Sequence, residues 1–140
     1  MIDIKKIEIF KMLPNDLEEI KQNFEIFKEE LVNNNSIYLV LKYENEIVAF
    51  GGIKIILDEA DIMNIVTKKD KRNLGFAGLL LNELINLAKK KNCKTITLEV
   101  NENNLPAIKL YKNFNFKEVG KRKNYYKNGD TAILMTLELD

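Results

Sequence analysis

One carboxylate in this chain could take part in proton transfer. Glu99 lies in the run Thr95–Val100, where Ile96, Leu98 and Val100 alternate with polar residues. That alternation predicts a strand with its apolar residues on one face and Glu99 on the other, near the end where open α/β sheets place their sites. A carboxylate there could act as a general base. The same pattern also describes a solvent-exposed glutamate on an outer face, and the spacing alone favours this second interpretation.

One phenol could act as a proton donor. Tyr111 shares a helical stripe with Ala107, Leu110 and Phe114, so its side chain is expected to point into the protein. A tyrosine on such a stripe is most often a core residue whose hydroxyl has a partner. The alternative is a hydroxyl directed at a site, where it could protonate a leaving group.

A third group of residues could bind phosphate. The segment Arg72-x-x-Gly75-x-Ala77 follows an expected strand and begins an expected helix. N–H groups at a helix N-terminus attract phosphate, and small residues let the backbone approach it closely. Neighbouring cations add positive charge; they are Lys68, Lys69, Lys71 and Arg72. A glycine-containing loop with solvated lysines is the alternative. The segment is neither a Walker loop nor a G-x-G-x-x-G motif, which disfavours ATP and NAD.

The composition excludes several other kinds of chemistry. The 140 residues contain no histidine, which rules out Ser-His-Asp and Cys-His nucleophiles and every His-ligated metal site, so we expect no metal. General acid–base catalysis would then have to use the side chains of Glu, Asp, Lys or Tyr. The single cysteine, Cys93, cannot form an internal disulfide and is typical of a reducing, cytoplasmic compartment.

Net charge, hydropathy and length disfavour a nucleic-acid-binding protein and a membrane protein, and they predict a single globular domain. Twenty-two basic and 21 acidic residues leave a net charge of +1, which is not the balance of a nucleic-acid-binding protein. No apolar run approaches the ~20 residues that span a bilayer, and the first ten residues do not resemble a secretory signal, so we expect no membrane association. The length and the 46% hydrophobic content predict one globular domain over residues 1–140.

Hydrophobic periodicity predicts the elements that must position these residues. The expected strands are residues 5–11, 37–43, 47–57, 60–66, 95–100, 116–122 and 131–139. The expected helices run from Pro14 to about Asn33, whole or broken in two, then from about Ala77 to Lys91, and from about Leu105 to Phe114. Gly51-Gly52 suggests a bulge or a close backbone approach. The order β-α-β-β-β-α-β-α-β-β implies an α/β (α+β) fold, with a mixed sheet and helices on its faces.

Taken together, these residues resemble the GNAT superfamily of acyl-CoA-dependent N-acetyltransferases. The stretch from Asn64 to Gly78 is similar to that superfamily's strand and R/Q-x-x-G-x-G/A pyrophosphate loop, and the stretch from Leu98 to Phe116 to its second half. The nearest likeness within it is to Rim-type ribosomal-protein-alanine N-acetyltransferases, through Asp58-Glu59-Ala60, Asn124-Tyr125-Tyr126 and Ala132–Met135. The resemblance implies a mostly antiparallel central sheet flanked by helices.

The resemblance also implies roles for individual residues. Ile65, Val66 and Thr67 would contact the pantetheine arm of acetyl-CoA through their backbone. The pyrophosphate would be cradled by Arg72, Asn73, Leu74, Gly75, Phe76, Ala77 and Gly78. Asn104 would touch the coenzyme near the following helix. Glu99 matches the general base of the family and Tyr111 matches its general acid.

The implied activity is acetyl transfer from acetyl-CoA to a primary amine by direct attack, by a monomer or a homodimer. The implied acceptor is the N-terminal α-amine of a protein such as a ribosomal protein. Two positions depart from the family pattern: Asn115 replaces a glycine, and Gln22–Glu30 lacks the proline and tryptophan of the loop that holds the peptide substrate. Two alternatives therefore stay open, a GNAT enzyme that acetylates a small amine or amino acid, and a non-catalytic acyl-CoA-binding module.

Overall fold

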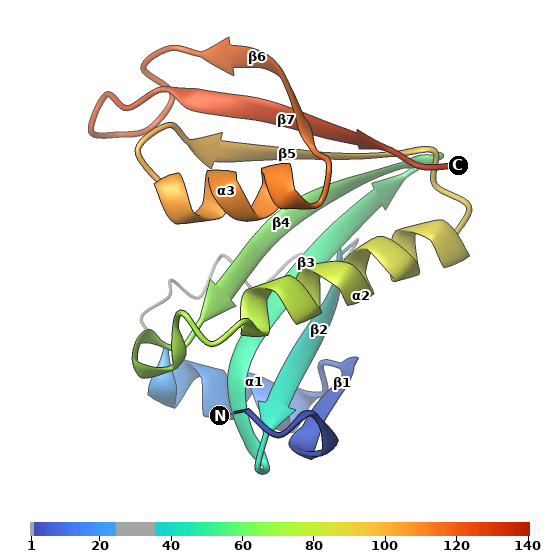
Figure 1. Ribbon diagram of the computed structural model, residues 1–140, viewed down its shortest axis with the longest axis vertical. Helices are drawn as coiled ribbons and strands as arrows, with labels where there is room; N and C mark the ends of the chain where they lie inside the picture. Colours follow the sequence, from blue (N-terminus) through green and yellow to red (C-terminus); the bar gives the residue numbers. More distant parts are fainter. Residues whose placement is uncertain (1, 25–35) are drawn as a thin grey trace. The chain divides into compact units, whose positions relative to one another are not determined.

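The strands of this chain form a mixed, mostly antiparallel sheet in the order β1-β2-β3-β4-β5-β7-β6, as a computed structural model that describes residues 2–24 and 36–140 shows (Figure 1). The strands are β1 (Ile7–Lys11), β2 (Ser36–Tyr43), β3 (Glu46–Ile56), β4 (Glu59–Thr67), β5 (Thr95–Asn101), β6 (Lys117–Arg122) and β7 (Ala132–Glu138). The helices are α1 (Pro14–Asn23), α2 (Phe76–Lys90) and α3 (Leu105–Asn113), with short 3₁₀ turns η1 (Ile4–Lys6) and η3 (Lys69–Lys71). The expected fold class and element order are confirmed. None of the helices within the described ranges has the length and apolar character that a bilayer crossing requires.

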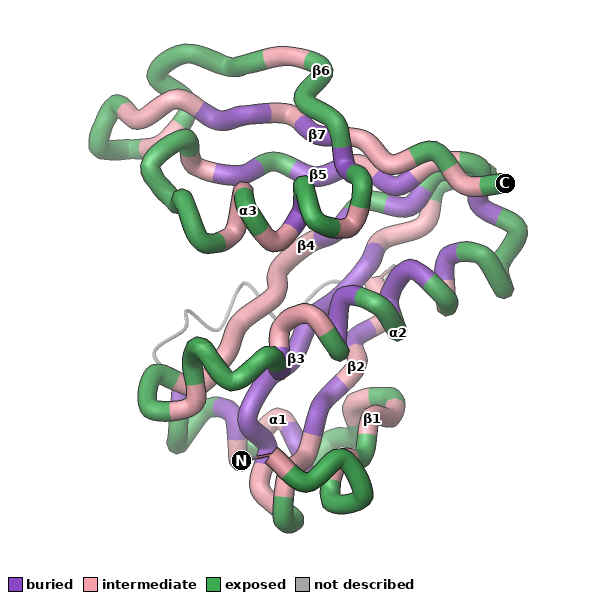
Figure 2. The backbone as a smooth tube through the Cα atoms, in the orientation of Figure 1, coloured by how far each residue is buried: buried purple, intermediate pink, exposed green. Residues whose placement is uncertain are grey.

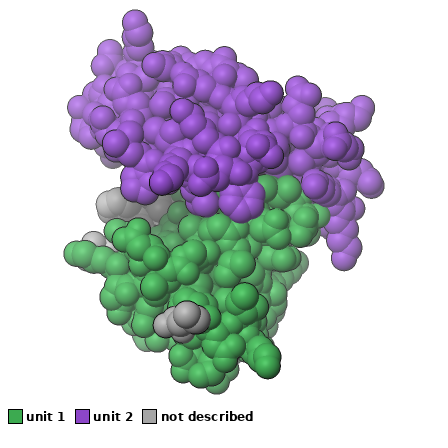
Figure 3. Space-filling model, in the orientation of Figure 1, with its two compact units in different colours: residues 1–54, 63–87 green, residues 55–62, 88–140 purple. Residues whose placement is uncertain are grey.

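The chain divides into two compact units (Figure 3). Unit 1 comprises residues 1–54 and 63–87, and unit 2 comprises residues 55–62 and 88–140. Unit 1 therefore contains α1, the antiparallel strands β1 to β3 up to Lys54, the second part of β4 and most of α2. Unit 2 contains β5, α3, β6, β7 and the first residues of β4.

The core of unit 1 is built on β2 and β3. It contains Ile20, Phe24, Tyr38, Val40, Ile47 and Phe50. The rings of Phe24 and Phe50 meet edge to face with their centroids 5.2 Å apart. Purple segments on β2 and β3 mark the positions of buried residues (Figure 2). α1 ends at Asn23 because Phe24 adopts an extended conformation. The expected continuation of this helix beyond Phe24 lies outside the described residues.

Two local features of unit 1 follow from its sequence. Glu44 and Asn45, which join β2 to β3, both have positive φ, as the tight turn of a two-residue hairpin requires. A Cβ atom on Gly51 would lie 2.9 Å from the backbone oxygen of Asn64, and one on Gly52 would lie 2.6 Å from the ring of Tyr38. The close backbone approach expected here is confirmed. In the pairing of β2 with β3 the register shifts between Leu41 and Lys42 and not at the two glycines.

The strands of unit 2 are arranged around β5. Its first residues pair in parallel with β4, from Glu59↔Thr95 to Asp61↔Thr97, and its whole length pairs antiparallel with β7. β6 lies on the other side of β7. The apolar face of β5 is buried as predicted, while Glu99 is exposed on the opposite face. α3 begins at its N-cap, Asn104, and the turn after it contains Asn115 with φ 70°, the left-handed conformation in which asparagine best replaces glycine.

Candidate active site

The turn that leads from β4 into α2 exposes the N-terminus of that helix. Asn73 and Gly75 have φ values of 63° and 89°, so the backbone turns through the left-handed region just before Phe76. Phe76 is 1% exposed and packs against the ring of Tyr43, which anchors the first residue of the helix. A Cβ atom on Gly75 would meet nothing within 4 Å. Because first-turn N–H groups have no acceptor within their own helix, this end of α2 can receive an anion.

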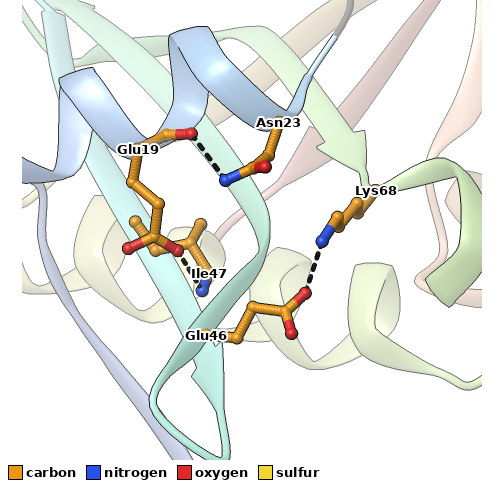
Figure 4. Close-up of polar contacts among 5 residues, drawn as sticks. All are labelled: Glu19, Asn23, Glu46, Ile47 and Lys68. Atoms are coloured by element: carbon orange, nitrogen blue, oxygen red, sulfur yellow. Dashed lines mark hydrogen bonds and ion pairs between the residues drawn. The ribbon is translucent and has the colours of Figure 1, made fainter.

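Polar contacts hold the base of this turn (Figure 4). The backbone N–H of Lys68 donates to the carbonyl of Val48 over 2.8 Å, and the ammonium group of Lys68 donates to the carboxylate of Glu46. Ile47, which follows Glu46 in β3, donates its backbone N–H to the side-chain carboxylate of Glu19 over 2.8 Å. The hydrogen bond with Glu46 raises the pKa of Lys68. Sequence reasoning assigned the charge of Lys68 to the phosphate loop, but the structure pairs it with a carboxylate, so Lys68 positions the loop.

The remaining cofactor-binding candidates of unit 1 lie on β4 and in the turn that follows. Ile65, Val66 and Thr67 are half-buried, and Val66 packs against the core of unit 1. Arg72 is exposed and directs its Nε–H towards the carbonyl of Thr67, at 3.4 Å. Leu74 is exposed, whereas Ala77 and Gly78 are half-buried in the first turn of α2. The whole expected pyrophosphate loop and the last residues of β4 thus lie within unit 1.

In unit 2, the carboxylate of Glu99 lies among three side chains from β6 and the loop that follows it. The Glu99 side chain is 31% exposed, and its Oε1 lies 3.7 Å from Nη2 of Arg122. The hydroxyl of Tyr125 donates a hydrogen bond to the same carboxylate, which raises the pKa of Tyr125. Burial and the charge of Glu99 raise the pKa of Tyr126. Glu99 is therefore accessible to solvent and surrounded by hydrogen-bonding and cationic groups.

Tyr111 is buried in unit 2, with 8% of its surface exposed. Its ring packs against Phe116 with the centroids 5.7 Å apart. Burial, with a smaller contribution from Tyr126, raises the pKa of Tyr111 to about 12. Tyr126 thus interacts electrostatically with Glu99 and with Tyr111, the two residues expected to act as base and acid.

Asp130 holds the loop that carries Tyr125 and Tyr126, a role that sequence reasoning missed. Its backbone carbonyl accepts the N–H groups of both tyrosines, at 3.1 and 3.2 Å. Its carboxylate accepts hydrogen bonds from Asn101 at 2.9 Å and from Asn128 at 3.0 Å, and these bonds lower the pKa of Asp130. The signal available in the sequence was the Tyr/Asn/Gly composition of this loop, which does not identify the residue that organises it.

Asn104, the last of the cofactor-binding candidates, acts as the N-cap of α3. Its side-chain oxygen accepts the backbone N–H of Ala107 over 3.3 Å. Because the cap uses the side-chain oxygen, a contact of the amide nitrogen of Asn104 with a coenzyme would leave the cap in place. The structure groups Asn104, Glu99 and Tyr111 in unit 2, and the pyrophosphate loop in unit 1.

Comparison with known proteins identifies the family of this chain. A family model described as "Acetyltransferase (GNAT) family" matches residues 5–116. This chain belongs to the GNAT acetyltransferase family. It is an acyltransferase of the N-acetyltransferase type, and both the family and the enzyme class that the sequence predicted are confirmed.

Several relatives match most of the chain. The ribosomal protein bS18-alanine N-acetyltransferase of Haemophilus ducreyi is 36% identical over 135 residues, which cover 89% of this chain and 93% of that protein. The Escherichia coli protein of the same name is 35% identical over 102 residues, 71% of this chain and 69% of that protein. The crystal structure of the E. coli ribosomal-protein-S18-alanine N-acetyltransferase superposes with a TM-score of 0.83 at 29% identity, covering 94% and 93% of the two chains. A GNAT acetyltransferase from Elizabethkingia anophelis, solved with acetyl-CoA bound, shares the fold with a TM-score of 0.75 at 24% identity, covering 96% of this chain and 99% of that one.

Proposed function

We propose that this GNAT enzyme uses acetyl-CoA to acetylate the N-terminal α-amine of a protein, such as a ribosomal protein. The observation that carries the proposal is the placement in unit 2 of an accessible carboxylate, Glu99, and a buried phenol, Tyr111, with Tyr126 interacting electrostatically with both. A base and an acid are the two groups that direct acyl transfer to an amine needs. The names of the relatives that match most of the chain support the acceptor class.

Acetyl-CoA supplies the acetyl group as an activated thioester. The exposed N–H groups at the start of α2, with Arg72 beside them, would hold its pyrophosphate. The backbone of Ile65, Val66 and Thr67 would contact the pantetheine arm, and an N–H group near Val66 would polarise the thioester carbonyl. Asn104 would contact the coenzyme through its amide nitrogen. The acetyl-CoA complex of the Elizabethkingia GNAT protein supports this choice of co-substrate.

In the proposed reaction the acceptor ammonium first loses a proton, directly or through water, to Glu99. The neutral amine attacks the thioester carbonyl to form a tetrahedral intermediate that still carries the second proton of the nitrogen. When the C–S bond breaks, Tyr111 donates a hydrogen bond or its proton to the departing thiolate. The second proton of the nitrogen then passes to Tyr111, if the phenol has given up its own, or to solvent. An α-amine with a pKa of ~8 is roughly several hundred-fold more deprotonated at pH 7 than a lysine side chain at ~10.4. A carboxylate is therefore a sufficient base for a protein N-terminus.

The pyrophosphate assignment predicts an effect of charge at Gly75. Gly75→Asp would place a carboxylate beside the bound diphosphate, and we expect the affinity for acetyl-CoA to fall by about tenfold or more. Gly75→Asn is the matched control, because asparagine has the same shape, carries no charge and tolerates positive φ. Isothermal titration of both folded variants would measure the difference. Equal affinities for acetyl-CoA in the Asp and Asn variants would show that no diphosphate binds at this turn.

The acceptor class can be tested with a peptide panel. The panel would contain a peptide with a free N-terminal alanine, the same peptide with a blocked N-terminus and an internal lysine, and a set of small amines and amino acids. Release of CoA and mass spectrometry of the products should show acetylation of the free α-amine and none of the blocked peptide. Turnover restricted to the small amines would favour the small-molecule alternative. Acetyl-CoA binding without turnover of any acceptor would indicate a non-catalytic module.

A further inference from the structure

Arg122 and Glu99 face each other across β7. Arg122 is in register with Ala132 of β7, and Glu99 is in register with Leu134 on the other edge of the same strand. Because Ala132 and Leu134 are two residues apart, both side chains lie on the same face of the sheet. The guanidinium reaches across to within 3.7 Å of the Glu99 carboxylate.

Tyr125 completes a group of three side chains in which each contacts the other two. Its hydroxyl donates to Glu99, and its ring lies 5.7 Å from the guanidinium carbon of Arg122. An arginine stacked on an aromatic ring loses much of its freedom, and its planar cation can then restrain a carboxylate. The backbone of Tyr125 is itself held by the carbonyl of Asp130.

The ion pair between Arg122 and Glu99 contributes little to the stability of the fold. A loss of activity on removing Arg122 would therefore not be explained by loss of folding. Arg122 is 57% exposed, and exposed ion pairs add little to protein stability. A glutamate on an exposed strand face would otherwise sample several rotamers, whereas a general base must lie within hydrogen-bond reach of the proton that it accepts. The contacts of Arg122 therefore bear on where the carboxylate of Glu99 lies.

We propose that Arg122 is a positioning residue of the acetyltransferase, which acts with Tyr125 to hold the Glu99 carboxylate where the acceptor amine is deprotonated. This inference rests on the proposed role of Glu99 as the base. Arg122 acts through Glu99, so its loss should lower kcat and leave the affinities for acetyl-CoA and for the acceptor peptide unchanged.

The test compares variants of the full chain with the peptide acceptor. Arg122→Gln should lower kcat by about 10- to 100-fold, the loss that misplacement of a catalytic group by an ångström causes. The acceptor KM, the acetyl-CoA affinity and the thermal unfolding midpoint should not change. Arg122→Lys keeps the charge and loses the planar stacking, so its kcat should lie between those of the wild type and the Gln variant. Lys121→Gln is the matched control. Lys121 is the neighbouring residue on β6 and forms an ion pair with Glu118, so this variant should retain wild-type kcat.

A double-mutant cycle separates this inference from the proposed function. If Arg122 acts through Glu99, the double variant with Arg122→Gln and Glu99→Gln should turn over no more slowly than Glu99→Gln alone. Losses that multiply, or an Arg122→Gln variant with a raised acceptor KM and normal kcat, would overturn the positioning role while leaving the base assignment intact. Wild-type turnover by Glu99→Gln would overturn both.

Discussion

Glu99→Gln is expected to lower kcat/KM for a peptide α-amine at pH 7 by about 10²–10⁴-fold, the usual contribution of a general base. The amide has nearly the shape of the carboxylate but cannot accept the proton of the ammonium group. Glu99 lies on an exposed face of β5, so the substitution should not affect folding. The affinity for acetyl-CoA should stay unchanged, because the coenzyme is bound by other residues. Steady-state kinetics and calorimetry on the same preparation would check both expectations.

The pH dependence of this loss identifies the acceptor as well as the base. An α-ammonium group with a pKa of ~8 loses its proton without help as the pH approaches 9, so the loss in Glu99→Gln should shrink over that range. A lysine acceptor at ~10.4 would still need the base, and its loss should persist. A small loss with peptide α-amines that does not vary with pH would mean that Glu99 positions substrate or supports the strand, and the base would have to be sought elsewhere.

Tyr111→Phe is expected to lower kcat by about 10²-fold, at the lower end of the range for a general acid. Burial raises the pKa of Tyr111 to about 12, which makes this phenol a weaker acid than a thiol with a pKa of ~8.5. Its largest effect is therefore a hydrogen bond to the thiolate as charge develops on the sulfur. The phenylalanine ring keeps the contact with Phe116, so the variant should fold and bind acetyl-CoA normally. Near-wild-type turnover by the folded variant would make Tyr111 a core residue only.

The raised pKa of Tyr111 also predicts the alkaline side of the wild-type pH profile. The phenol is protonated below its pKa and is lost as a donor only when the pH rises towards about 12. If Tyr111 had the ordinary tyrosine pKa of ~10, the enzyme would begin to lose activity about two pH units lower. We therefore expect kcat with saturating peptide to stay level between pH 8 and pH 10, as far as the folded state persists. A decline centred near pH 10 would contradict the burial that is assigned to this hydroxyl.

Local sequence patterns determined the elements and the faces that their residues occupy. Alternation in β5 placed Glu99 opposite the buried Ile96, Leu98 and Val100, and the helical stripe of α3 placed Tyr111 in the core. Both predictions succeeded because a strand repeats every two residues and a helix every 3.6, so burial on one face leaves a periodic signal within a few residues. The family was indicated differently, by the resemblance of the residues from Asn64 to Gly78 and from Leu98 to Phe116 to known family motifs.

Partners that are distant in the sequence were decided only by the tertiary structure. The periodicity of β5 says that Glu99 faces away from the core, but not that Arg122 reaches it across β7 or that Tyr125 donates to it. Lys68 was expected to serve phosphate, and Glu46, from the start of another strand, binds it instead. Such pairings depend on strand order and register and on the rotamers of long side chains, and these follow from packing of the whole chain. The sequence by itself therefore determined the family and the candidate acid and base, whereas the folded chain decided which groups surround each of them.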